Sequence, residues 1–236
     1  MRELKQYIEL YHLSGIADFF LNLSKQKPTQ QIPPKKIISH QSDIPEPIIQ
    51  LWEKCKACSS CKYRNDRTKL VFGKGSLKAK CLILGNPVNA DENLSGEPFG
   101  KSNSSVYADQ FARIIKKGLI EGEKLSITKD DLYLTNITKC RAKSLDYEEI
   151  KKCLPFLRQQ IDIIKPKIIL VFGEVAANAL FGKTENINYY RNNQGLSFQN
   201  IPVYVTFNPI DMIKTESLKK IAWMDLKHFA QKYRDL

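Results

Sequence analysis

Apolar and polar positions follow two periods that alternate along the chain after residue 78. Four short apolar runs have the length of buried strands, at residues 79–84, 131–136, 167–172 and 202–207. Longer segments with apolar residues three or four positions apart, which is helical spacing, lie at residues 105–117, 146–164, 174–180 and 216–233. Strands that alternate with helices are typical of a parallel sheet covered on both faces. The pattern therefore predicts an α/β fold with three α/β/α layers around a central, mainly parallel, four-stranded sheet.

The first 47 residues differ from the rest of the chain. Apolar residues recur at helical spacing in residues 1–24, with a break near Gly15, which predicts an N-terminal helical appendage. Residues 25–47 contain five prolines and read as a linker, because proline interrupts both helices and central strands. Residues 48–236 are long enough to form one α/β domain with its own core.

The carboxyl ends of the four predicted strands meet at one edge of the sheet, where α/β proteins place their binding sites. Polar and glycine residues stand at these ends. Gly85, Asn86 and Pro87 follow the first strand, Asn136 ends the second, and Asn208 follows the fourth. We expect the functional site at this edge.

Six cysteines are candidates for metal binding. Cys58 and Cys61 have the two-residue spacing that lets one turn present both thiolates to a metal, and Cys140 and Cys153 form a second pair. Thiolate ligands suit zinc as well as an iron-sulfur cluster, so the ligands alone leave both open. Cys55 is an alternative ligand at the same spacing before Cys58, and Cys81 lies in a predicted buried strand.

Composition narrows the class of partner and the compartment. The formal net charge is +12 and the sequence pI is near 9.3, which favours a polyanionic partner such as nucleic acid over a basic surface kept only for solubility. No run approaches the eighteen or so apolar residues that a membrane helix needs. We expect a cytoplasmic monomer with no membrane partner, in a reducing compartment where clustered cysteines are metal ligands rather than disulfides.

The order of short motifs resembles a known family. Residues 58–61 read Cys-Ser-Ser-Cys, residues 67–68 Arg-Thr, and residues 71–75 Val-Phe-Gly-Lys-Gly. Further matches follow in order at residues 96–99, 133–141, 153–155, 173–177 and 219–226. From residue 58 to about 225 the chain resembles the iron-sulfur-cluster branch, family 4, of the uracil-DNA glycosylase superfamily.

The resemblance implies a 4Fe-4S cluster held by Cys58, Cys61, Cys140 and Cys153, with zinc as the alternative. It also implies a pocket for a uracil flipped out of single- or double-stranded DNA, and hydrolysis of its N-glycosidic bond.

Several residues match the family's substrate-binding positions. Phe99 stands at the position of the stacking ring. Asn136 stands at the amide that pairs with the uracil edge, and Gly85, Asn86 and Pro87 form the loop beside it.

Two departures from the family pattern concern the predicted catalytic residues. Asn86 stands where the family has a glutamate, which leaves Asp91 or Glu92 to orient the attacking water. Asn208 stands in place of the histidine that donates to the uracil oxygen, and an amide stabilises the developing anion less well. Asn208 followed by proline also suits the start of a helix.

Three hypotheses follow. The first is a DNA-repair glycosylase acting on uracil or a related deaminated base. The second is an iron-sulfur nucleic-acid-binding protein of the same fold with weak or no activity, and the third is a zinc-bound structural module. Apolar residues after Asn208, namely Ile210, Met212 and Ile213, are candidates for a wedge that enters the duplex, or for core packing.

Overall fold

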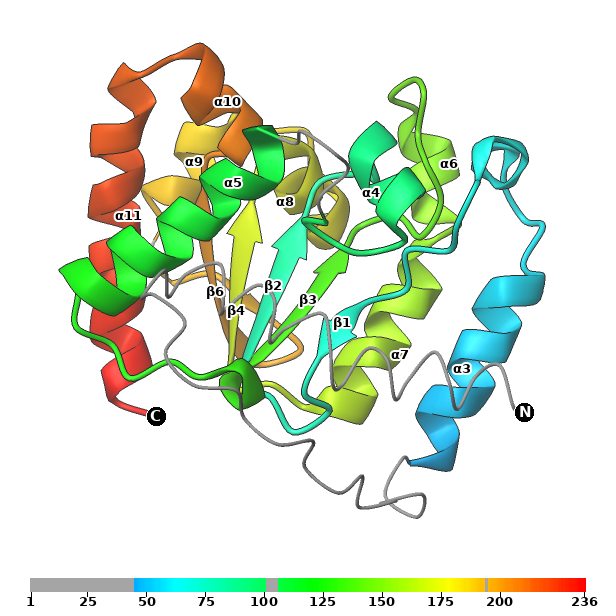
Figure 1. Ribbon diagram of the computed structural model, residues 1–236, viewed down its shortest axis with the longest axis horizontal. Coiled ribbons are helices and arrows are strands. Elements are labelled where there is room, and N and C mark those ends of the chain that lie inside the picture. The colour runs from blue at the N-terminus through cyan, green and yellow to red at the C-terminus, as the bar shows by residue number, and fades with distance from the viewer. Residues whose placement is uncertain (1–44, 101–105, 194) are drawn as a thin grey trace, which may run out of the picture.

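The computed structural model describes residues 45–100, 106–193 and 195–236 (Figure 1). The predicted appendage at residues 1–24 and the predicted linker up to residue 44 lie outside these described residues. The described part begins with helix α3 (Glu46–Ala57), which has proline in its first turn, where a missing N–H costs nothing. The helix starts two residues before the predicted domain boundary at residue 48.

Six strands form one sheet in the order β1-β3-β2-β4-β6-β5. The strands are β1 (Lys74–Gly75), β2 (Cys81–Gly85), β3 (Leu132–Asn136), β4 (Ile168–Phe172), β5 (Ser197–Phe198) and β6 (Ile201–Thr206). The parallel centre β3-β2-β4-β6 confirms the four predicted strands. The predicted count of four is wrong because β1 and β5 add two antiparallel edges, and two residues are too few to show a period.

The other helices flank this sheet. They are α4 (Ala90–Ser95), α5 (Val106–Arg113), the π-helix η3 (Ile114–Gly122), α6 (Tyr147–Lys151), α7 (Leu154–Ile164), α8 (Glu174–Phe181), α9 (Ile187–Arg191), α10 (Pro209–Lys214) and α11 (Ser217–Arg234), with short 3₁₀ turns η2 (Lys62–Asp66) and η4 (Lys129–Asp131). In the described residues, no helix combines the length and the apolar character needed to cross a membrane.

Two predicted helix boundaries are wrong for identifiable reasons. Gly118 does not end its helix. A side chain there would come within 3.1 Å of Leu226 on α11, so this glycine allows close packing of two helices. The predicted helix at 146–164 is two helices, and α7 starts anew because Pro155 lies in its first turn, where it cannot continue the preceding helix.

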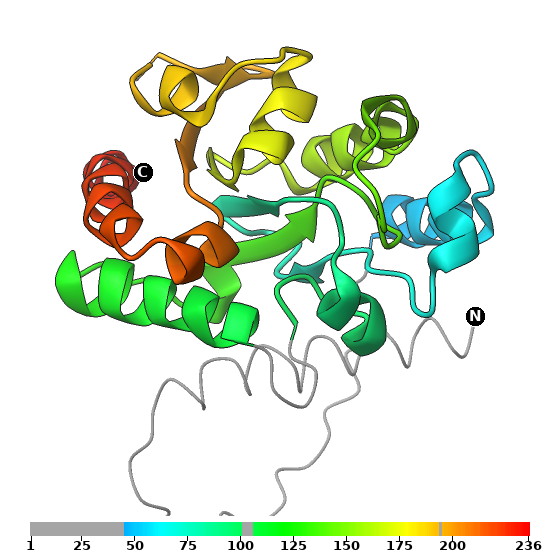
Figure 2. The ribbon, with the colours of Figure 1, turned by 90° about the horizontal axis from the view of Figure 1, so that it is seen from above.

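Helices cover both faces of the sheet (Figure 2). Side chains that alternate along the strands separate two cores, one on each face. On β2, Cys81 and Ile83 pack with the core under α5, η3 and α11, whereas Leu82 and Leu84 pack with the core under α6, α7 and α8. The fold is therefore three-layered, as predicted. A third, smaller cluster joins α3 to the rest and includes Trp52.

Candidate functional site

A cavity of about 440 Å³ lies at the carboxyl ends of the parallel strands, the edge predicted to carry the site. Its walls come from the segments that follow β2, β3, β4 and β6, including the first turns of α4, α8 and α10, and from α5. The lining residues are Asn86, Pro87, Asn89, Ala90, Asp91, Tyr107, Ala142, Leu145, Val175, Asn208 and Ile210. Its size and position suit a ligand as large as a nucleobase.

Glu92 is a fully buried carboxyl group beside this cavity. It lies in the first turn of α4, where it forms a reciprocal capping box with Asn89. One carboxyl oxygen accepts the Asn89 N–H at 2.9 Å; the other accepts the Phe99 N–H at 2.8 Å and Asn136 Nδ2 at 3.0 Å. Burial raises the pKa of Glu92 to about 7, although these three donors act to lower it.

Asn136, at the end of β3, has its side-chain amide fixed in one orientation. Nδ2 donates to the backbone oxygen of Asn86 at 2.9 Å and to Glu92. The Oδ1 atom is buried and has no hydrogen-bond partner. Gly85 permits this arrangement, because a side chain there would lie 3.0 Å from Asn136 Nδ2 and 2.9 Å from the Phe99 ring.

Phe99 has a backbone conformation that is rare for a residue with a side chain, with φ of 53°. The Glu92 carboxyl group holds its N–H in this position. One face of the ring stacks on Phe111 with centroids 4.0 Å apart, and Tyr107 lies parallel to it at 5.9 Å. Strained backbone of this kind is often found at functional sites.

The predicted site residues lie in two layers around the cavity. Asn86, Pro87, Asp91 and Asn208 line it directly. Glu92, Asn136 and Phe99 are buried one residue behind it, since Asn136 bonds to the Asn86 carbonyl and Phe99 stacks with Tyr107, both of which line the cavity.

Asn86 does not use its side-chain oxygen for the cavity. Its Oδ1 accepts the N–H of Ala176 at 3.1 Å in the first turn of α8, and so caps a helix from another segment. Gly173 makes room for it, since a side chain there would lie 2.4 Å from that oxygen. Of the two predicted acidic residues, Asp91 is the one that lines the cavity.

Asn208 caps α10, as its sequence context predicted. Its Oδ1 accepts the Ile210 N–H at 2.9 Å, and the residue is almost completely buried. Tyr107 stands beside it. Burial and the nearby Glu92 carboxyl group raise the Tyr107 pKa well above its ordinary value, against a smaller lowering by hydrogen bonding with the Asn208 side chain. The Tyr107 phenol therefore stays protonated, next to Asn208.

Tyr107 was missed by the sequence analysis. Its position in an amphipathic helix looks like core, and only its place above the strand ends brings it to the cavity. The aromatic spacing of Tyr107 and Phe111, four residues apart on the helix that follows Phe99, was the available signal.

A polar clamp holds the loop that carries Asn208. Arg191 on α9 makes two hydrogen bonds to the Asp225 carboxylate on α11, at 2.7 and 2.8 Å. Asp225 also accepts the Thr206 hydroxyl at 2.8 Å, and the guanidinium lies over the Phe207 ring at 4.6 Å. Arg191 is thus committed to holding β6 and the loop before Asn208.

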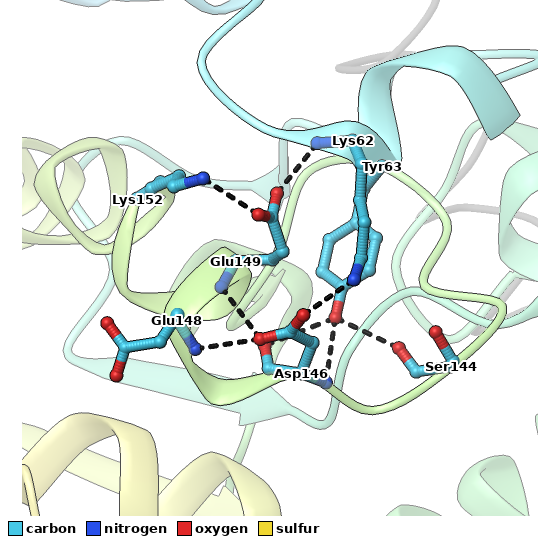
Figure 3. A network of polar contacts seen from close by, with 7 residues as sticks. All are labelled: Lys62, Tyr63, Ser144, Asp146, Glu148, Glu149 and Lys152. Atoms are coloured by element: carbon cyan, nitrogen blue, oxygen red, sulfur yellow. Dashed lines mark hydrogen bonds and ion pairs between the residues drawn. The ribbon is translucent and has the colours of Figure 1, made fainter.

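A second polar network joins two segments that carry the cysteine pairs (Figure 3). Just after Cys61, the Lys62 N–H donates to Glu149 at 2.7 Å and its ammonium group pairs with Asp146 at 2.6 Å. The Tyr63 hydroxyl donates to backbone oxygens of Ser144 and Asp146 and accepts the Asp146 N–H. Since Asp146 and Glu149 lie between Cys140 and Cys153 in the sequence, the network brings the two pairs to the same region.

The thiols of the four predicted ligands influence one another electrostatically but are not assembled into a ligand set. Burial raises the pKa of Cys153 to about 12 and also raises that of Cys140, and charges on Cys61 contribute to both. Within the described residues, no group of three or more histidine, cysteine, aspartate or glutamate side chains is arranged to hold a metal ion. The predicted ligand assignment therefore stays a prediction.

The alternative ligand Cys55 and Cys81 are both buried. Cys55 packs with Trp52 in the α3 cluster and also interacts electrostatically with Cys153, Cys140 and Cys58. Burial first, and then the nearby Cys153, raise its pKa. Cys81 is fully buried in β2, as predicted.

The Arg67-Thr68 motif connects the cysteine region to the site. Arg67 donates to the Cys140 sulfur at 3.7 Å and to backbone oxygens at the end of α3. Thr68 exchanges hydrogen bonds with the Asn93 side chain on α4, the helix of Glu92.

Lys139, completely buried, donates to Thr135 and to the Asn136 carbonyl, and burial lowers its pKa to about 8.

The fold and this site together define a class of α/β protein with a nucleobase-sized cavity above its parallel strands. A family model described as "Uracil DNA glycosylase superfamily" matches residues 72–227, so the chain belongs to this superfamily. It is 29% identical over 190 residues to a type-4 uracil-DNA glycosylase of Sulfurisphaera tokodaii, covering 76% of this chain and 82% of the relative. A type-4 uracil-DNA glycosylase of Thermotoga maritima is 28% identical over 184 residues, covering 74% and 88%.

A type-5 uracil-DNA glycosylase of Pyrobaculum aerophilum is 23% identical over 147 residues, covering 57% of this chain and 63% of the relative. The matches at higher identity are to type-4 enzymes, and they confirm the resemblance read from the motifs.

Proposed function

We propose that this protein removes uracil, or a related deaminated base, from DNA by hydrolysis of the N-glycosidic bond. Membership of the superfamily supports this function, and the +12 net charge suits a DNA substrate. The observation that carries the proposal is the Oδ1 atom of Asn136, which is buried without a partner while both amide hydrogens are held in place.

An orphaned acceptor of this kind selects for a base with an N–H group. Uracil has a hydrogen on N3, whereas cytosine has a lone pair there, so cytosine would leave the Asn136 acceptor unsatisfied and repel it. A site whose buried polar group stays unpaired with the wrong ligand discriminates strongly. Asn136 bonds to Asn86, which lines the cavity, so this acceptor lies one residue behind the cavity wall, and the proposal requires the base to reach past Asn86 to it.

The departing base accumulates negative charge, which needs donors near its oxygens. Asn208 and the neutral Tyr107 phenol both line the cavity and can donate to that charge. Asp91, also in the lining, can orient the attacking water. Glu92 acts one step back, as the residue that positions the Asn136 amide and the Phe99 backbone.

We also propose that Cys58, Cys61, Cys140 and Cys153 hold a 4Fe-4S cluster, with zinc as the alternative. Two observations support this assignment: the Lys62 and Tyr63 contacts join the segment after Cys61 to the segment between Cys140 and Cys153, and Arg67 donates to the Cys140 sulfur. When bound, the cluster would supply a covalent cross-link between these segments. Visible absorbance distinguishes the two metals, because zinc thiolates are colourless.

Excision of uracil from single- and double-stranded oligonucleotides tests the proposed activity. We expect the purified full-length chain to release uracil, Asn136→Ala to lose at least about a hundredfold in rate, and Asp91→Asn to lose on the order of tenfold or more. Asn178→Ala is the matched control, because Asn178 is an equally buried asparagine that bonds only within the α8–α9 region.

Equal losses in the Asn136 and Asn178 variants would show a general effect on folding and would contradict the role of Asn136. If the wild-type chain released uracil from neither substrate, the proposed glycosylase activity would be refuted.

A second function, binding of DNA without efficient excision, is favoured by two observations. The face of Phe99 that stacks on Phe111 is covered, and the Asn86 side-chain oxygen caps α8 instead of facing a water. The excision assay distinguishes this second function from the glycosylase, since DNA binding without efficient excision predicts no base release.

A further inference from the structure

Lys139 is a charged side chain that is enclosed in the protein without an acidic partner. Only 1% of it is exposed, and its ammonium group donates to the Thr135 hydroxyl and, at 2.8 Å, to the Asn136 carbonyl oxygen, both of which are neutral. The other buried lysine of the described residues, Lys74, pairs with the Glu97 carboxylate at 2.7 Å. A buried charge without an opposite charge is unfavourable, so Lys139 calls for a negative partner.

The negative charges that act on Lys139 belong to cysteines. They are those of Cys153 first, and then of Cys55 and Cys140. The Lys139 backbone also forms a hydrogen bond with the Cys153 side chain. A free buried thiol carries no charge, whereas a cysteine that binds a metal is a thiolate. The ammonium group therefore has an ionic partner when these sulfurs ligate a metal.

A second cation is directed at the same sulfurs. Arg67 donates to the Cys140 sulfur at 3.7 Å, and its other hydrogen bonds go to the backbone oxygens of Cys55 and Lys56. A metal centre held by four thiolates has a net negative charge, whether the metal is zinc or an iron-sulfur cluster. Two cations that approach one group of sulfurs suit such a centre, and of the two only Lys139 is completely buried.

We propose that the Lys139 ammonium group is the buried counter-charge of the metal-thiolate centre and ties that centre to the end of β3, where Asn136 lies. This inference rests on the metal centre proposed for Cys58, Cys61, Cys140 and Cys153. Thr135 helps to fix the ammonium group, since its hydroxyl lies 3.0 Å from the Phe72 carbonyl oxygen and 3.3 Å from the Gln160 side-chain oxygen. Lys139 is a positioning residue, because it contacts the backbone of Asn136 and not the cavity.

Lys139→Met tests the charge, because methionine is of similar length and neutral. We expect the purified full-length variant to transfer its metal to a chelator at least about tenfold faster than the wild type, as is typical when a group that supports metal ligands is removed. If the metal is iron, the reduction potential of the centre should also fall, since loss of a positive charge disfavours an added electron. Atomic emission spectrometry gives the initial content of iron and zinc.

Two control variants separate the charge of Lys139 from its burial. Lys74→Met removes a similarly buried lysine whose partner is a carboxylate, and it should retain metal as the wild type does. Thr135→Val removes one hydrogen bond of Lys139 and keeps the charge, so it should release metal more slowly than Lys139→Met. Lys139→Arg also keeps the charge, and it provides a test if Lys139→Met does not fold.

Metal release at the wild-type rate from Lys139→Met would overturn the proposal. Equally fast release from Thr135→Val, or fast release from a folded Lys139→Arg, would overturn it too, because both keep the charge. A wild-type chain that binds neither iron nor zinc would refute the metal centre and this inference with it. A metal-loaded wild type that releases no uracil would refute the proposed glycosylase alone.

Discussion

Glu92 is a carboxyl group removed from water and surrounded by three donors. Its burial raises the pKa to about 7 from an ordinary 4.5, so the folded state binds this proton more tightly than the unfolded chain does. The contribution to stability is complete below about pH 4.5 and is lost as the pH rises through about 7. The same carboxyl group positions Asn136 and Phe99. The stability lost when Glu92 ionises is therefore linked to the arrangement of the site.

Replacement of Glu92 by glutamine removes the titration. As the pH rises from 4.5 to 8, we expect the free energy of unfolding of the wild type to fall relative to Glu92→Gln by about 3 kcal/mol. Urea denaturation at a series of pH values measures this difference. Parallel pH profiles of the two proteins would show that Glu92 titrates normally.

Asn208 has two roles, one in stability and one in the proposed chemistry, and they favour different side chains. Its side chain caps α10, and the residue lines the cavity. The motif resemblance implies a histidine at this position in the family. We expect Asn208→His to raise the single-turnover rate of uracil release on the order of tenfold, because an imidazole stabilises the anion better. The same change should lower stability by about 1 kcal/mol through loss of the cap.

Asn186→His separates the two effects. Asn186 caps α9 in the same way, by accepting the Tyr189 N–H, and lies outside the cavity lining. It should lower stability similarly with no change in the rate. An unchanged or lower rate in Asn208→His would contradict the inferred role of position 208 in charge stabilisation.

The two segments that carry the cysteine pairs are far apart in sequence and are joined by contacts between a short 3₁₀ turn and a loop. The 3₁₀ turn η2 follows Cys61, and the loop before α6 follows Cys140. Tyr63 in η2 joins them through three hydrogen bonds. Nothing in the sequence identified this tyrosine, because its three hydrogen-bond partners are backbone atoms, which any residue type provides.

Tyr63→Phe removes only the hydroxyl group from this junction. We expect a loss of about 1 kcal/mol in stability and fewer iron atoms bound per chain, because the two cysteine segments would be joined less firmly, by the Lys62 contacts without those of the Tyr63 hydroxyl. Iron analysis and thermal unfolding measure the two effects. Tyr189→Phe is the control, since its hydroxyl accepts a single bond from Lys183 elsewhere on the surface. Equal iron content in both variants would contradict the role of the junction.

The central strands were predictable because each is buried on both faces and is therefore mostly apolar. Helix α4 was not predicted, although Asn89 and Glu92 have the spacing of a capping box. A helix of six residues is too short to show a period. Pro155 likewise indicated the break between α6 and α7. Apolar residues at helical spacing continue on both sides of it, so the pattern predicted one helix.

At the scale of the molecule, the sequence predicted the layers and the edge that holds the site, because both follow from the order of strands and helices. It did not predict which site residues reach the cavity. Asp91 and Glu92 are neighbours in sequence, yet one lines the cavity and the other is buried behind it. That difference depends on the direction of α4, which no local pattern specifies.

The net charge of +12 predicts a strong dependence of DNA binding on salt. Many basic residues are already committed: Lys74 pairs with Glu97, Lys143 with Asp66 and Arg191 with Asp225. Arg141 begins the loop of Leu145 at the cavity and remains a candidate for contact with phosphate.

We expect Arg141→Ala to weaken binding to any duplex sequence and to reduce the slope of log affinity against log salt by about 1. Lys227→Ala on α11, the helix that runs from α10 toward the opposite end of the sheet, removes the same charge away from the cavity (Figure 1). Fluorescence anisotropy at several salt concentrations gives both slopes. If the two variants lose affinity equally, the DNA would be held by the overall charge of the protein and not by the edge of the sheet that carries the cavity.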